Sequence, residues 1–355
     1  MSLNANRKTG WLIILISVIF ASTARASGDD FVIGSARVPR GGVYAGYLSV
    51  PAMNDGGTQI PFTVIHGAQP GPVLALVAGV HAYEYPPILA LYRLKGKIDP
   101  KTLHGTVLMV HIANLPSFKR RTIYYGPDDW KNLNRVFPGD LNGTMSQRIA
   151  AVLTNEVVKR SDVLLDMHCG DGNEALIPYT YWMISGDKAF DAKTRELALA
   201  FGVPHIIIDD QRTADLADSK YLGNTAVLRK KPAISTEIGF LGRTDEGSVS
   251  ANVKGTLSVM RHLGMIDGKP APVTDPVWID KYEVIMSKWD GLFAPRVEMG
   301  YYVRQGQVVG TVTDYLGNWK EDVKAPFTGI LLYVIGTPPC NAGEPLFEVG
   351  RVKED

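Results

Sequence analysis

The chain has little cysteine and almost no excess of charge. Its 355 residues include only two cysteines, Cys169 and Cys340, too few for the disulfide framework of a small secreted fold. We expect both to be unpaired thiols. Lys and Arg number 37 against 36 Asp and Glu, a net charge of +1. This balance argues against nucleic acid or an acidic membrane surface as a partner.

Long apolar runs are also missing. The one near the N-terminus covers residues 11–21, well short of the ~20 residues of a membrane-spanning helix. Arg7 and Lys8 precede it, and the small-x-small sequence Ala24-Arg25-Ala26 follows it. This layout is typical of a secretory signal peptide. We therefore expect residues 1–26 to be removed and the mature chain, without a membrane span, to be periplasmic or secreted in a bacterium; an uncleaved anchor is the alternative.

The remaining residues are too many for one compact core, so two domains are expected. Apolar runs at residues 73–78, 105–112 and 162–170 alternate with helical patterns. This alternation predicts an α/β domain over residues 27–270, with flanking helices on a mostly parallel mixed sheet. A linker rich in Gly, Pro and Asp precedes a second domain at 280–355.

The segment 280–355 has short β-type runs separated by glycines and no helical period. It resembles the barrel-sandwich domain of biotinyl and lipoyl carriers, through the strings at residues 303–310 and 324–329. A carrier needs a lysine at a hairpin tip, and Lys320 is a poor candidate for it. We expect a small all-β domain that serves as a lid or a packing module.

Polar side chains stand where predicted strands end. His81 and Glu84 follow the run 73–78. His168 lies near the end of the strand predicted over residues 162–170, and Glu237 lies near the end of the strand predicted over residues 231–239. In open α/β sheets, ligands gather at the carboxyl ends of the strands. Each signal is weak alone, because a histidine at a strand end is more often structural. Their conjunction indicates one site.

The residue types at these strand ends suit a catalytic zinc site. Such a site takes three protein ligands, often two His and one carboxylate. His81, Glu84 and His168 are the predicted ligands of one Zn²⁺ per chain. Glu237 is then free to act as the general base that activates water. Cys169 is not expected to be a ligand, because neighbouring residues of a strand point to opposite faces.

One further string makes the pattern specific: Asn134-Arg135-x-Phe137-Pro138-Gly139, located between Glu84 and His168. The whole order of motifs resembles the succinylglutamate desuccinylase/aspartoacylase family of the zinc carboxypeptidase superfamily. The resemblance covers nearly the whole mature chain. It implies that His81, Glu84 and His168 bind zinc and that Glu237 is the catalytic carboxylate.

The resemblance also assigns the substrate contacts. Asn134 and Arg135 match the pair that holds the substrate's free carboxylate, and Arg offers a two-pronged donor suited to that group. The family uses a further upstream Arg to polarise the scissile carbonyl. Arg120 and Arg121 are the candidates, and Arg121 is favoured. Ala82, Tyr83 and the segment 114–139 are expected to shape substrate choice.

The function implied is zinc-dependent hydrolysis of an amide next to a free carboxylate, with an N-acyl amino acid or related small molecule as substrate. An exported metallocarboxypeptidase acting on peptides or peptidoglycan fragments is the alternative within the same chemistry. A periplasmic binding protein without catalysis is the alternative from another class. The sequence leaves open the acyl group, the amino acid and whether the chain forms a homo-oligomer.

Overall fold

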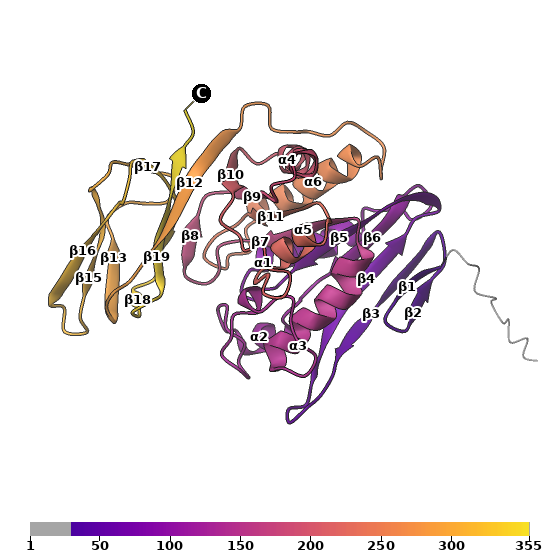
Figure 1. Cartoon of the computed structure of the whole chain (residues 1–355), viewed down its shortest axis with the longest axis horizontal. Helices are drawn as coiled ribbons and strands as arrows, with labels where there is room; N and C mark the ends of the chain where they lie inside the picture. The colour runs from indigo at the N-terminus through magenta and orange to yellow at the C-terminus, as the bar shows by residue number, and fades with distance from the viewer. Residues whose placement is uncertain (1–29, 355) are drawn as a thin grey trace, which may run out of the picture.

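The computed structural model describes residues 30–354. The expected signal peptide, residues 1–26, lies outside the described residues. Most of the described chain is organised by one mixed, 13-stranded sheet with helices on both faces (Figure 1). Its strands are, in sheet order, β14 (Tyr302–Val303), β17 (Gly329–Ile335), β19 (Pro345–Val352), β12 (Val277–Met286), β10 (His205–Asp209), β9 (Tyr179–Met183), β11 (Ala233–Glu237), β7 (Val163–His168), β5 (Gln69–Ala78), β6 (His104–Val110), β4 (Thr58–His66) and β3 (Gly42–Val50), with β8 (Glu174–Leu176) paired to β17.

The centre of the sheet is the expected α/β unit. Strand β5 lies parallel to β6 on one side and to β7 on the other, and β7 lies parallel to β11. The wings are antiparallel, through β3 and β4 at one edge and β12, β19 and β17 at the other. The predicted fold class, a mixed sheet with flanking helices followed by an all-β region, is confirmed.

Strand β5 shows why the central strands read as continuous apolar runs. Leu74 and Leu76 belong to the core on one face of the sheet, and Ala75 and Val77 to the core on the other. A strand covered on both faces needs apolar side chains at every position. The first core is covered by α1 (Tyr85–Lys95), α4 (Lys188–Phe201) and α6 (Glu246–His262), and the second by α3 (Met145–Val152) and α5 (Leu222–Leu228).

The remaining elements are short. They are the two-stranded sheet β1 (Phe31–Ile33) and β2 (Ala36–Val38), helix α2 (Leu115–Arg120), the 3₁₀ turn η1 (Leu133–Arg135), the π turn η2 (Leu153–Val157) and the 3₁₀ turn η3 (Val158–Arg160). Helix α3 is therefore continued by two irregular turns as far as Arg160. No helix among residues 30–354 has the length and apolar character to span a membrane.

The C-terminal region shares strands with the large sheet. A four-stranded sheet of β16 (Trp319–Lys324), β15 (Val308–Thr313), β13 (Gly291–Pro295) and β18 (Pro339–Cys340) forms its outer part. Its other strands, β12, β17 and β19, continue the central sheet (Figure 1). Strand β12 begins inside residues 264–280, the segment expected to be a linker, and pairs directly with β10. We call residues 277–354 the C-terminal lobe.

Both cysteines are free and buried, as expected. The Cys169 thiol donates to the carbonyl of Gly170, with 3.3 Å between sulfur and oxygen.

The last residue of the Asn-Arg-x-Phe-Pro-Gly string, Gly139, is a glycine for a structural reason. Gly139 has φ of +87°, and a Cβ at this position would overlap the backbone of α3 at Ala151 and Gln147. Gly186 has a similar φ of +84° but open space around it. A side chain at either position would strain the backbone, but only a side chain at residue 139 would also overlap neighbouring atoms.

We predict that Gly139→Ala destabilises the protein by about 2–4 kcal/mol and the control Gly186→Ala by only about 1 kcal/mol. Both alanines must adopt a left-handed backbone, but only the first also displaces a helix. Denaturant or thermal unfolding of the two variants measures the difference. Equal losses of stability would contradict this account of the motif.

Candidate active site

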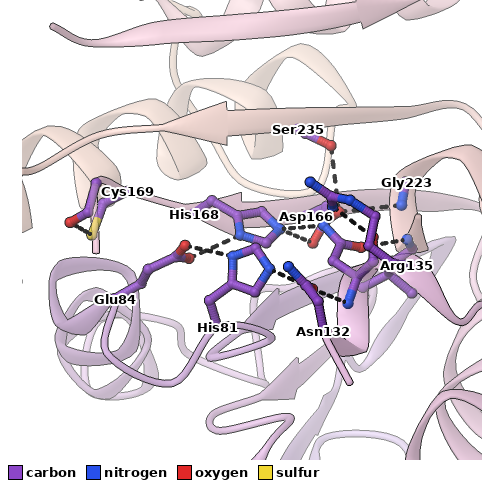
Figure 2. A network of polar contacts seen from close by, with 12 residues as sticks. His81, Glu84, Asn132, Arg135, Asp166, His168, Cys169, Gly223 and Ser235 are labelled. Carbon is purple, nitrogen blue, oxygen red and sulfur yellow. Dashed lines mark hydrogen bonds and ion pairs between the residues drawn. The ribbon is translucent and has the colours of Figure 1, made fainter. Parts of the chain in front are cut away.

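The structure brings His81, Glu84 and His168 together. Both oxygens of the Glu84 carboxylate are used: Oε1 lies 2.8 Å from Nδ1 of His81, and Oε2 lies 2.8 Å from Nδ1 of His168. One ligand atom from each residue lies within 4.8 Å of the other two. Figure 2 shows the three side chains converging on one point. These are the atoms that would hold a metal ion.

Neighbouring parallel strands explain why the three side chains meet. Strand β5 ends at Ala78, and Gly79, with φ of +70°, turns the chain toward His81. Glu84 is the N-cap residue of α1, so the end of the strand and the start of the helix fix its position. His168 is the last residue of β7, the parallel neighbour of β5.

The outward nitrogens of both imidazoles face oxygen atoms. Nε2 of His81 lies 3.0 Å from Oδ1 of Asn132, and Nε2 of His168 lies 2.9 Å from Oδ1 of Asp166 (Figure 2). Such an oxygen favours the tautomer in which Nε2 carries the proton, which leaves the Nδ1 lone pair free for a metal. Asp166 is fixed in turn by the amide of Gly223 at 3.2 Å and the hydroxyl of Ser235 at 3.4 Å.

The charges at this point favour a cation. Burial acts to raise the pKa of Glu84, but His168 and His81 outweigh it and the pKa is lowered. Burial acts to lower the pKa of His168, but Asp166 and Glu84 raise it well above its usual range. A buried cluster of two carboxylates around an imidazole needs positive charge, supplied by protons or by a metal ion.

Glu237 lies beside the cluster. It ends β11, directly opposite His168 in the parallel register of β11 and β7. Its carboxylate lines the cavity and forms no hydrogen bond with any residue in the range 30–354. Burial, together with the carboxylates of Glu84 and Glu348, raises its pKa, although His168 acts in the opposite direction. A carboxylate with a raised pKa and no protein partner is suited to exchange a proton with a ligand.

Asn134 and Arg135 line the same cavity from η1. The Asn134 amide is largely engaged: its oxygen accepts from the amide of Leu222 at 2.9 Å, and its nitrogen lies 3.4 Å from Nε2 of His168. The Arg135 guanidinium lies over the ring of Tyr221, 4.7 Å from its centroid, and one nitrogen donates to the Asn134 carbonyl. Arg135 therefore has donors left for a carboxylate.

Arg120 and Arg121, the candidates for polarising the carbonyl, are not brought to this cavity. Arg121 follows the end of α2, where φ of 57° turns the chain, and both side chains are exposed. Tyr124, a few residues further on, occupies the cavity wall instead, with its ring edge-on to His81 at 6.3 Å. Neither arginine is among the residues that line the cavity.

Arg212 is a cation of the cavity that the sequence did not single out. Its Nε donates to Asp209, and its guanidinium lies 4.0 Å from the ring centroid of Tyr221 and 5.2 Å from that of Tyr181. Lys131 also lines the cavity. Neither residue belongs to a recognisable motif, because both reach the site only through the fold.

The cavity measures about 650 Å³ and has walls from both parts of the chain. The C-terminal lobe contributes Tyr282, Val284, Met286, Tyr333, Gly343, Pro345 and Glu348. This lobe is thus part of the site, beyond the lid or packing module expected from the sequence.

Comparisons with known proteins agree with this geometry. The model of the family "Succinylglutamate desuccinylase/Aspartoacylase catalytic domain" matches residues 70–263. The chain is 31% identical to the N-alpha-acetyl-L-2,4-diaminobutyric acid deacetylase of Halomonas elongata, over 88% of this chain and 93% of that protein.

Solved structures with the same fold include a succinylglutamate desuccinylase/aspartoacylase from Rhodobacter sphaeroides, with 27% identity and a TM-score of 0.78 over 89% of this chain and 97% of that one. Another is the product-bound ectoine utilization protein of Ruegeria pomeroyi, with 25% identity and a TM-score of 0.79 over 92% and 99%.

We predict that zinc affinity falls steeply as the pH is lowered. Because Asp166 and Glu84 raise the pKa of His168 well above its usual value of 6.5, a proton competes with the metal ion for this imidazole. Each proton displaced by the metal weakens binding by about tenfold per pH unit. Competition with a chromophoric chelator between about pH 8 and pH 6 measures this slope, and a flat profile would contradict the assignment of Nδ1 as a ligand atom.

Asp166→Asn should weaken zinc binding by about 10- to 100-fold. The variant keeps the shape of the side chain but removes the charge that orients His168 and makes it a better ligand. Asp162→Asn is the matched control, because Asp162 is exposed and its side chain accepts only from the amide of Val73, at 2.9 Å, away from the cavity. Equal affinities of the two variants would show that Asp166 does not support the ligand.

Proposed function

Because the chain belongs to the succinylglutamate desuccinylase/aspartoacylase family, we propose that it hydrolyses the amide bond of an N-acyl amino acid. The observation that carries this proposal is the cluster of His81, Glu84 and His168 with Glu237 beside it in one cavity. The relative from Halomonas elongata is named for the same class of reaction. N-alpha-acetyl-L-2,4-diaminobutyric acid is therefore the first substrate to assay.

We further propose one Zn²⁺ per chain, held by His81, Glu84 and His168. Two imidazole nitrogens and a carboxylate form a donor set typical of catalytic zinc, and the oxygens behind both imidazoles fit it. When bound, such an ion lowers the pKa of water and polarises a carbonyl oxygen.

The chain's own residues supply the proton transfers and the binding. Glu237 accepts a proton from the attacking water and returns it to the nitrogen of the leaving amine. Its raised pKa suits both steps, since the same carboxylate must first take and then release the proton. Arg135 holds the free carboxylate of the substrate with two parallel hydrogen bonds, and Asn134 supports the loop that presents it.

Arg212 and Tyr124 are the candidates for polarising the scissile carbonyl, the role expected of Arg121, because both line the cavity and Arg121 does not. The wall contributed by the C-terminal lobe favours a small molecule over a peptide as substrate.

The N-terminal pattern supports export to the periplasm or beyond. Detection of the processed chain in a periplasmic fraction tests that part of the proposal.

We predict that Glu237→Gln lowers kcat by about 10²- to 10⁴-fold with bound zinc retained, because the amide cannot accept the proton of water. Steady-state deacetylation and metal analysis of the same preparation measure both quantities. Glu283→Gln is the matched control: Glu283 is exposed on β12 and does not line the cavity. Undiminished turnover by the Glu237 variant would overturn the mechanism.

A further inference from the structure

The cavity contains more carboxylates than the proposed reaction uses. Glu84 is matched by two imidazoles, and the lining residue Arg212 pairs with Asp209, which does not itself line the cavity. Asp171, Glu174 and Glu348 also line the cavity. Within residues 30–354, none of these three has a Lys, Arg or His nitrogen within ion-pair distance. They are carboxyl groups facing a space that a ligand would fill.

Glu348 is the most informative of the three. It lies on β19, opposite Val284 of β12 and Tyr333 of β17, and both of those neighbours line the cavity. Cross-strand partners present their side chains on the same face of the sheet. The Glu348 side chain therefore points into the cavity, although the residue is only 1% exposed.

One oxygen of Glu348 lacks a partner. Oε2 accepts from the hydroxyl of Tyr179 at 3.3 Å, while Oε1 is buried with no hydrogen bond. Buried carboxylate oxygens without a donor are costly, so they are rare unless something else supplies the donor. A ligand in the cavity would supply it.

Asp171 and Glu174 approach the same region from the loop after β7. Asp171 is 2% exposed, and its Oδ1 accepts from the amide of Asn173 at 3.1 Å. Glu174 begins β8, which pairs with β17 beside Tyr333, and its carboxylate has no hydrogen-bond partner in the described part of the chain. Burial raises the pKa of Asp171 to about 7 and that of Glu348 to about 8, although Tyr179, Arg212 and Tyr181 act to lower the pKa of Glu348. A cation bound beside these carboxyls would lower both pKa values and stabilise the charged forms.

Tyrosine rings form the rest of this wall. Tyr179, Tyr181, Tyr282 and Tyr333 line the cavity, with ring centroids 5.4 Å apart for Tyr179 and Tyr181 and 6.0 Å apart for Tyr181 and Tyr282. Aromatic faces beside carboxylates suit an organic cation. A second metal ion fits less well, since the only described trio of side chains close enough to share one ion is His81, Glu84 and His168.

We propose that Glu348, together with Glu174 and Asp171, forms a subsite for an ammonium group on the side chain of the substrate. The inference rests on the proposed function and narrows its substrate class to N-acylated diamino acids. With the scissile amide at Glu237 and the α-carboxylate at Arg135, the acyl chain and the amino-acid side chain are the parts of the substrate left to meet the other walls, and only the side chain can carry an ammonium group.

A matched pair of substrates tests the subsite. Nα-acetyl-2,4-diaminobutyrate and Nα-acetyl-norvaline have side chains of equal length, ending in an ammonium and a methyl group respectively. The zinc-loaded enzyme should show a kcat/KM higher by about tenfold or more for the cationic substrate, as expected for a charged hydrogen bond. The ratio of the two values is the readout, so a general loss of activity does not affect it.

Glu348→Gln should reduce that ratio by about tenfold, whereas the control Glu283→Gln, which removes a charge on the neighbouring strand outside the cavity, should preserve it. Calorimetric binding of 2,4-diaminobutyrate against norvaline gives the same comparison without turnover. If no acyl amino acid is hydrolysed but the amine preference in binding persists, the proposed function fails and the subsite stands.

Three results would overturn the subsite. The first is equal or better hydrolysis and binding of the norvaline compounds by the unaltered enzyme, and the second is a ratio of kcat/KM values unaffected by Glu348→Gln. The third is a second equivalent of zinc per chain that disappears in Glu348→Gln, which would make these carboxylates metal ligands.

Discussion

The Glu84 carboxylate is the contact on which the rest of the site depends. It is buried, 2% exposed, and its two oxygens each face Nδ1 of a different histidine. One of these histidines follows β5 and the other ends β7, so a single side chain ties two neighbouring strands at their carboxyl ends. A buried carboxylate without such partners would be unfavourable. The position of Glu84 at the start of α1 therefore constrains strand, turn and helix together.

The oxygens behind the imidazoles extend this constraint outward. Asn132 fixes one ring and Asp166 the other, and Asp166 is itself held from α5 and β11 through Gly223 and Ser235. The segment that contains Asn132 also supplies Asn134 and Arg135 to the cavity. Ligand orientation and substrate contacts are thus fixed by the same few residues, which explains why the motif around Asn134 is the most specific part of the sequence.

The sequence predicted the parts of the site that follow strand order. His81, Glu84, His168 and Glu237 stand at the ends of apolar runs, and the topological rule for open sheets was enough to bring them together. Arg121 shows where that reasoning stops: it follows α2 in a loop and has a left-handed backbone with φ of 57°, and strand order does not predict the position of such a residue. Tyr83 was likewise expected at the pocket but packs on Tyr85 instead, with ring centroids 5.2 Å apart.

The C-terminal lobe was the least predictable part, for a physical reason. Its short β-type runs separated by glycines predicted an all-β region, but such runs do not say which face of a strand meets another part of the chain. That information comes from the pairing of β12 with β10, which extends the sheet and turns Tyr282, Val284 and Met286 toward the cavity. Once β19 pairs with β12, Glu348 must share that face. A charged residue in a strand reads as solvent-exposed in the sequence, and only the extended sheet shows that it lines a buried wall.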